Sequence, residues 1–191
     1  MARRERAMMV DMTAVSPHPI LAGRWTIERE GSSVGFAIKH LGVATVRGRF
    51  TAFDGAVAFD DGGALSAEGT ARVDSIATGD AKRDGILQGE EFFGADEFPA
   101  IAFHGTATRR LPRGRIGVDG EITIRGHAEP LELAVAVREV AGDPDVLELE
   151  ATGTIDRTRF GMPFDRGASS ALLGKQVKLE LSVRARRAGS R

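Results

Sequence analysis

Histidine is the first side chain to test for chemistry, because imidazole binds metals and transfers protons near neutral pH. The chain has four histidines, and three of them, His40, His104 and His127, fall in the part with regular strand patterning. They lie far apart, without the His-x-x-x-His spacing or clustered carboxylates typical of zinc and iron sites. The sequence therefore predicts no metal site and no other cofactor, with His104 and His127 on outward or turn positions.

Serine, cysteine and carboxylate chemistry has equally little support. No Gly-x-Ser-x-Gly motif is present, and the chain has no cysteine, so disulfides and thiolate nucleophiles are excluded. The carboxylates of residues 80–91 and 156–165 have no spacing that predicts a facing acid–base pair. We therefore expect no enzyme. The alternative is an enzyme for a small lipid-like substrate with His40 or Asp156 as acid or base, which a buried histidine–carboxylate pair facing a cavity would favour.

Phenylalanine supplies most of the bulk in this chain. Ten phenylalanines and one tryptophan stand among many Ala, Val, Gly and Leu residues. Several phenylalanines only fill a core, but small residues at inward strand positions predict unfilled space between them. These small residues are Ala67, Gly69, Ala71, Gly105, Gly120, Ala151 and Gly153.

The elements that position these side chains are strands. From Arg24 onward apolar and polar residues alternate, which is the period of a strand with one wet and one dry face. Turns rich in Gly, Pro and Asp separate the runs, so neighbouring strands are antiparallel. About eight such strands, with 24 glycines that favour a coiled sheet, predict an all-β fold closed into an eight-stranded antiparallel barrel rather than a sandwich. Such a barrel is just wide enough to be filled by side chains or to hold one ligand.

One segment, residues 75–98, breaks the alternation. Residues 79–88 predict a short helix capped by Thr78 or Asp80 and ended by Gly89, with a second turn near residues 90–93. The segment carries five large apolar side chains, which cannot all stay in water. They are Ile86, Leu87, Phe92, Phe93 and Phe98. We therefore expect the segment to lie over one end of the sheet as a lid.

The net charge and the length of the chain limit its possible partners and its number of domains. The formal net charge of −1 leaves no field to attract nucleic acid, and the 191 residues need only one domain. No run of about 20 apolar residues predicts a membrane span, and Asp11 and Pro17 interrupt any signal-peptide core. We expect a cytoplasmic protein without stable membrane insertion. Its parts would be a mobile extension over residues 1–22, a barrel domain over residues 23–187 and a tail over residues 188–191.

Several motifs in order resemble one known family, the YceI-like proteins, which are described as lipocalin-like barrels that bind polyisoprenoids. The motifs lie at residues 25–27, 33–41, 46–50, 75–84, 92–93, 98–103, 120–126, 155–161 and 177–183. Two positions depart from the family pattern: Arg159 stands where an acid is usual, and Asp156 where Asn is commoner. Many members also carry a signal peptide and work in the periplasm, whereas no such segment is seen here.

The resemblance implies a carrier or store for a long isoprenoid-type lipid, such as a polyprenyl phosphate or a quinone precursor, held in the barrel lumen. The apolar candidates for contact with the lipid are Phe36, Ile38, Phe50, Ile86, Leu87, Phe92, Phe93, Phe98, Phe103 and Phe160. His40, Arg83 and Arg157 are the candidates for its head group. A filled barrel acting only as an interaction module is a further alternative, and the strand faces around Val135 and Val177 are candidates for a homodimer contact.

Overall fold

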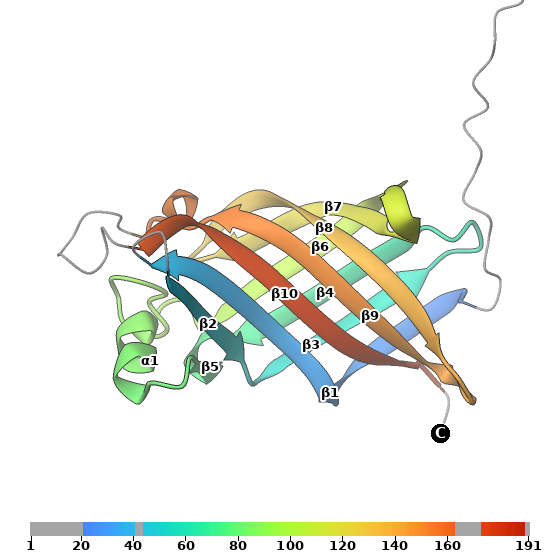
Figure 1. Cartoon of the computed structure of the whole chain (residues 1–191), viewed down its shortest axis with the longest axis horizontal. Coiled ribbons are helices and arrows are strands. Elements are labelled where there is room, and N and C mark those ends of the chain that lie inside the picture. The colour runs from blue at the N-terminus through green and yellow to red at the C-terminus, as the bar shows by residue number, and fades with distance from the viewer. Residues whose placement is uncertain (1–20, 41–43, 163–172, 190–191) are drawn as a thin grey trace, which may run out of the picture.

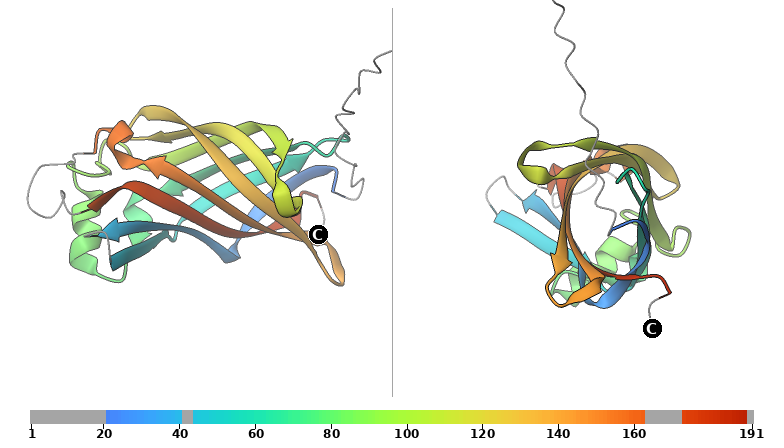
Figure 2. Two further views of the ribbon diagram at one scale, coloured as in Figure 1. Left: turned by 45° about the horizontal axis from the view of Figure 1, so that its top comes forward. Right: turned by 90° about the vertical axis from the view of Figure 1, so that its right-hand side faces the viewer.

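The structure, a computed structural model, describes residues 21–40, 44–162 and 173–189. Its strands form one antiparallel sheet in the order β10-β9-β8-β7-β6-β4-β3-β1-β2-β5, and β10 also pairs with β1. That last pairing closes eight strands into a ring, which is visible when the molecule is viewed along its length (Figure 2). The predicted eight-stranded antiparallel barrel is therefore confirmed, with β2 and β5 as extra strands.

The ring strands are β1 (Gly23–His40), β3 (Phe53–Phe59), β4 (Leu65–Arg72), β6 (Ala100–Arg110), β7 (Ile116–Ile124), β8 (His127–Val140), β9 (Asp143–Asp156) and β10 (Leu173–Arg187). The extra strands are β2 (Ala44–Phe50) and β5 (Ile76–Ala77). One α-helix, α1 (Ala81–Gln88), and three short 3-10 turns, η1 (Val73–Ser75), η2 (Pro112–Gly114) and η3 (Arg157–Phe160), complete the described part of the chain. No helix within these ranges is long and apolar enough to cross a membrane.

Strand β1 is the longest element, and it changes partner along its length. Its first residues pair with β3, its later residues pair with β2, and it follows β10 along its other edge. The register with β10 shifts between Glu28 and Ser33, and the strand bends there (Figure 1). Gly31 lies in this bulge with φ 79°, a conformation that glycine adopts without strain.

One end of the barrel, which we call the closed end, is filled by side chains. Trp25 is 0% exposed, and its indole Nε1 donates a hydrogen bond of 2.9 Å to the Leu21 carbonyl. The Arg187 guanidinium lies over the indole ring at 4.2 Å, a cation–π contact. The other buried side chains at this end belong to Leu21, Phe59, Val118, Val146, Leu147 and Ala185. Leu21, which the sequence placed in the mobile extension, therefore packs in the core, while residues 1–20 of that extension lie outside the described residues.

The opposite end carries α1 and is called the lidded end (Figure 1). Helix α1 begins after Asp80, whose carboxylate accepts hydrogen bonds from the backbone N–H groups of Lys82 and Arg83, and it ends at Gly89. The end at Gly89 and the Asp80 cap follow the sequence prediction, whereas the helix starts two residues later than the predicted residue 79. A turn over residues 90–93 follows the helix as expected. The helix buries none of its own residues. It therefore covers the end of the barrel rather than filling it.

An apolar lumen beneath the lid

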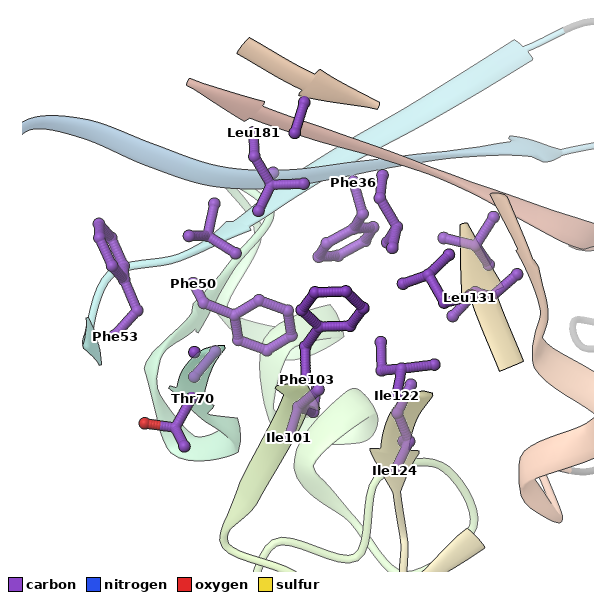
Figure 3. Close-up of a pocket in the computed structure, with 18 of the residues that line it drawn as sticks. Phe36, Phe50, Phe53, Thr70, Ile101, Phe103, Ile122, Ile124, Leu131 and Leu181 are labelled. Carbon is purple, nitrogen blue, oxygen red and sulfur yellow. The ribbon is translucent and has the colours of Figure 1, made fainter. Parts of the chain in front are cut away.

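The barrel encloses a cavity of about 670 Å³ that extends from the middle of the lumen to the lidded end. Its volume falls in the range of small-molecule sites, roughly 300–1,000 Å³. Aliphatic and phenyl side chains make up most of its wall (Figure 3). The side chains that fill the closed end, such as Trp25 and Leu147, do not line it.

Strands β7 to β10 supply one side of the wall through their inward positions. Period-two alternation puts every second side chain into the lumen, and the antiparallel register sets these side chains beside one another. They are Ile122, Ile124, Leu131, Leu133, Val135, Leu149, Ala151, Ile155, Val177, Leu179, Leu181 and Val183. Val135 and Val177 thus face the lumen, so these two side chains are not available for a homodimer contact.

Phenylalanine rings from three strands gather around the opposite side of the lumen. Phe36 of β1 and Phe50 of β2 have ring centroids 5.8 Å apart, and Phe103 projects from β6 beside them (Figure 3). Phe93, in the turn after α1, meets Phe50 edge to face at 6.0 Å. Phe93 packs against both apolar clusters of the barrel, so the lid is held to the lumen wall by an aromatic contact.

A set of hydrogen bonds around Thr78 holds the base of the lid. The Asp84 carboxylate accepts from the Thr78 hydroxyl at 2.5 Å and from its backbone N–H at 2.9 Å. Arg83 donates to the same hydroxyl at 2.7 Å and to the Thr78 carbonyl at 2.9 Å. Gln88 at the other end of the helix donates to the carbonyl of Asp74 at 3.1 Å. These bonds fix α1 at its start and its end over the mouth of the cavity.

Polar side chains of the cavity wall lie mainly at the lidded end. His40, Arg83, Glu91 and Arg157 border the cavity there. Arg157 is 3% exposed and donates to the carbonyls of Gly174 and Leu173 at 2.9 and 3.3 Å. Burial lowers the pKa of the Arg157 guanidinium, and the negative charge of Asp156 partly offsets this shift. All three head-group candidates from the sequence therefore stand at one end of an apolar chamber.

The other polar lining residues, Asp54, Glu68 and Thr70, are exposed to solvent and flank the bare backbone of Gly69. Glu68 forms an ion pair with Arg24 on the outer surface, which holds the pKa of its carboxyl below the ordinary value. These residues give the lumen no inward charge of their own.

The 3-10 turn η3 positions Arg157. Asp156 precedes the turn, and its carboxylate accepts hydrogen bonds from the Thr158 hydroxyl at 2.7 Å and from its N–H at 3.0 Å. These bonds hold the pKa of Asp156 below its ordinary value. Arg159, which stands where the family pattern has an acid, turns outward and donates to Glu129 at 2.8 Å. Asp156 thus acts as a cap for the turn.

Eight of the ten apolar residues expected to contact a ligand line the cavity, and two do not. The eight are Phe36, Ile38, Phe50, Ile86, Leu87, Phe92, Phe93 and Phe103. Phe160 is 1% exposed within the main core, where it packs away from the lumen. Phe98 lies against the backbone of Gly94 and Gly126. The alternation in β7 to β10 predicts that these apolar side chains are buried. It does not distinguish side chains that line a cavity from side chains that fill a core, so these residues are absent from the predicted site.

The sequence predicts unfilled space beside all of the small inward residues, but the structure shows such space beside only some of them. Ala67, Gly69, Ala71 and Ala151 do border the cavity. A methyl group on Gly105, Gly120 or Gly153, in contrast, would come within 3 Å of neighbouring atoms. The space above these three glycines is occupied by Phe103, Val118 and leucine side chains, so for them the expectation of unfilled space is wrong.

His40 and Asp156, the acid or base candidates of the enzyme alternative, have different surroundings in the structure. His40 borders the cavity, whereas Asp156 is engaged with Thr158, and within the described residues no hydrogen bond joins His40 to a carboxylate. His104 and His127 are exposed, as expected. No group of three His, Asp or Glu side chains that could hold a metal ion occurs in the described ranges.

A closed antiparallel barrel with an apolar chamber under a short lid defines the class of lipocalin-like barrels. The family model of the YceI-like domain matches residues 25–185. A UPF0312 protein of Staphylococcus aureus (strain USA300) is 36% identical over 167 residues, which cover 83% of this chain and 95% of that protein. The chain belongs to the YceI-like family.

Solved structures share the fold at low sequence identity. The crystal structure of Burkholderia cenocepacia BcnA superposes with a TM-score of 0.75 and 22% identity, covering 83% of this chain and 98% of that one. A polyisoprenoid binding domain from Saccharophagus degradans, implicated in plant cell wall breakdown, superposes with a TM-score of 0.67 and 10% identity, covering 85% and 98%. A Campylobacter jejuni YceI protein superposes with a TM-score of 0.68 and 23% identity, covering 78% and 89%.

Proposed function

We propose that the protein holds one long apolar lipid of the isoprenoid type in its lumen and acts as a carrier or store for it. The observation that carries this proposal is the apolar cavity of about 670 Å³ beneath the lid. Soluble proteins normally fill their interiors to crystal-like density, so an unfilled apolar chamber of this size supports a role in binding an apolar molecule.

The length of the chamber suits a chain molecule. Its wall includes inward residues of β10 from Leu173 to Val183. Ten residues at a rise of about 3.3 Å and a strand tilt of about 40° extend for roughly 25 Å along the barrel axis. A chamber of this length accommodates several consecutive isoprene units in an extended chain.

Burial of the chain supplies the binding free energy. Each methylene-sized group moved from water into an apolar site contributes about 0.8 kcal/mol, and association costs about 4–15 kcal/mol. A chain of a few isoprene units therefore offsets the cost of binding without any polar contact. The Saccharophagus degradans domain, whose fold this chain shares, is described as polyisoprenoid-binding, which supports the same ligand class here.

The head group of the lipid would lie at the lidded end. Arg83, Arg157 and His40 border the mouth of the cavity, whereas the deep part is bounded by aliphatic side chains such as Leu65 and Leu149. Guanidinium groups favour phosphate or quinone oxygens, because their N–H donors form charge-assisted hydrogen bonds. The proposed orientation therefore has the chain inside and the polar end under α1.

The experiment is native mass spectrometry of the protein purified gently from its own host, followed by lipid identification after denaturation. We expect a discrete added mass that matches an isoprenoid. A repeatedly clean apo mass, together with a crystal structure whose lumen is packed with side chains, would overturn the proposal.

A matched pair of variants locates the site. Ala67 lines the cavity, whereas Ala102 on the neighbouring strand β6 is exposed on the outer surface. Ala67→Phe should reduce the lipid-bound fraction about tenfold or more, since its ring occupies the lumen, and Ala102→Phe should leave it unchanged. Equal lipid loading in both variants would show that the lipid binds elsewhere.

A further inference from the structure

Two of the rings that face the lumen rest on glycines that do not themselves line it. The rings belong to Phe36 and Phe103 (Figure 3). A Cβ on Gly105 would lie 2.8 Å from Cζ of Phe103, and one on Gly120 would lie 2.9 Å from the same atom. A Cβ on Gly48 would lie 2.7 Å from Cε1 of Phe36. The far edge of each ring therefore lies over a glycine, at a place where any side chain would displace it.

We call Gly48, Gly105 and Gly120 the glycine seats, and we propose that they set the width of the lumen and thereby its selectivity for methyl-branched over straight chains. The inference rests on the proposed function, since it concerns the same lumen. Because the seats receive the far edges of the rings, the rings come closer to the wall than they could if these positions carried side chains.

The atoms around Gly105 determine which way the Phe103 ring would move if position 105 carried a side chain. The three atoms nearest to a Cβ there are side-chain atoms of Phe103 and Val118. Val118 is 0% exposed and packs in the main core, so it has little room to move. Phe103 is only half-buried and borders the cavity. Gly105→Ala should therefore turn the Phe103 ring into the lumen.

The other two seats differ from Gly105. At Gly120 a Cβ would also clash with the His104 carbonyl oxygen and with Cα of Gly105, so an alanine there strains the sheet itself. At Gly48 a Cβ would meet Cγ2 of Thr78 at 2.9 Å as well as the Phe36 ring. The Gly48 seat therefore lies under a lid residue and a ring together, and Gly105 offers the cleaner test.

Chain branching makes the width of the lumen selective. An isoprenoid carries a methyl group on every repeat unit, so it has a larger cross-section than a straight alkyl chain. A ring turned into the lumen removes space that the methyl branches need, whereas a straight chain can pass beside it. Narrowing should thus weaken the binding of the branched chain more than that of the straight one.

The experiment measures dissociation constants of geranylgeraniol and of stearyl alcohol, a straight-chain alcohol, by native mass spectrometry titration. Gly105→Ala should weaken geranylgeraniol binding about tenfold and stearyl alcohol binding by less than about threefold. Adding Phe103→Leu to Gly105→Ala should restore geranylgeraniol binding, since the shorter side chain removes the obstacle.

Gly85→Ala is the matched control. Gly85 lies in α1 and does not border the cavity, and a Cβ there would meet no atom within 4 Å. This variant adds the same methyl group without displacing a ring or entering the lumen. It should change the ratio of the two dissociation constants by less than about twofold.

Crystal structures of the wild type and of Gly105→Ala separate the possible failures. An unmoved Phe103 ring, or an equal loss of affinity for both alcohols, would overturn the role of the seats while leaving the proposed function intact. A wild-type protein that binds neither alcohol would overturn the proposed function and the selectivity with it, whether or not the ring moves in the variant.

Discussion

The closed end and the lidded end are built from the same antiparallel strands with the same inward alternation, yet one is filled and the other is hollow. At the closed end Trp25 and Phe59 project into the ring and are almost fully buried. Toward the lidded end the far edges of the Phe36 and Phe103 rings lie over glycines in the wall. The hollow therefore does not come from a shortage of apolar side chains. It comes from where the large ones are directed.

The two ends also use arginine differently. At the closed end Glu28 pairs with Arg184 at 3.3 Å and with Arg186 at 2.6 Å, on the outer surface. At the lidded end the Arg83 guanidinium binds Thr78, and that of Arg157 binds strand carbonyls, both beside the cavity. Apart from Arg187, which covers Trp25, these charges at the closed end lie on the outer surface, whereas charge at the lidded end borders the lumen.

The largest expected difference between the ends is in the cost of removing an aromatic ring. Trp25→Ala should lower the free energy of unfolding by about 3–5 kcal/mol, because it empties a packed site and removes the hydrogen bond to Leu21. Phe36→Ala should lower the free energy of unfolding by less than half as much, since one side of this ring already faces a cavity. Urea unfolding measures both values. Equal costs would mean that both ends are equally packed.

Adding bulk should have opposite results at the two ends. Ala185 at the closed end is 0% exposed, and Ala185→Leu should destabilise the protein by about 1–3 kcal/mol through overpacking. Ala151 is also buried but lines the cavity. Ala151→Leu should leave stability unchanged or raise it by about 1 kcal/mol, because the new side chain enters open apolar space. Thermal unfolding measures the stability of both variants. If Ala151→Leu lost as much stability as Ala185→Leu, the claim that the lidded end is hollow would be contradicted.

Loosening the lid should affect opening more than global stability. Asp84→Ala removes two hydrogen bonds to Thr78, worth about 1 kcal/mol net, so the lid should open about fivefold more often. Hydrogen exchange of the backbone N–H of Phe93, which donates to the Leu87 carbonyl, reports this opening. Asp96→Ala is the control, because Asp96 is exposed and has no hydrogen bond in the described part of the chain. Equal exchange in both variants would show that Thr78 does not hold the lid.

The smallest expected effect is a pH dependence at η3. The Thr158 hydroxyl and N–H hold the pKa of Asp156 below its ordinary value in the folded protein. A carboxyl with a lowered folded pKa contributes stability above its unfolded pKa, near 3.9, and loses it as the pH falls through the folded value. The Tm difference between the wild type and Asp156→Ala should therefore have its largest value above about pH 5 and decrease below about pH 4. A difference that stayed constant down to about pH 2 would contradict this assignment.

Much of the barrel could be predicted from the sequence, because a period of two determines which face of a strand is buried. The inward sets of β9 and β10, such as Leu149 and Leu181, followed directly from alternation. The full extent of β1 did not, since the bulge at Gly31 breaks the alternation between its two halves. The lid helix was predictable because Asp80 and Gly89 are ordinary helix-end residues.

The hollow itself was harder to predict, because composition does not show where a ring points. Gly69 and Gly105 look alike in the sequence, yet the first borders open space and the second lies under Phe103. Phe93 and Phe98 both belong to the lid segment, yet only Phe93 reaches the cavity. These distinctions depend on χ angles and on neighbours across the sheet, which strand alternation does not report.

The pairing of β1 with β10 also bears on how the protein is made. Within the described residues the ring closes between the first strand, β1, and the last, β10, and this seam pairs Trp25 with Arg187. During synthesis β1 leaves the ribosome long before its partner exists, and contacts this distant in sequence form slowly. Until β10 is complete the other strands have no interior, only a curved sheet with two open edges. The lipid of the proposed function would therefore enter the lumen only after that step, once translation is complete.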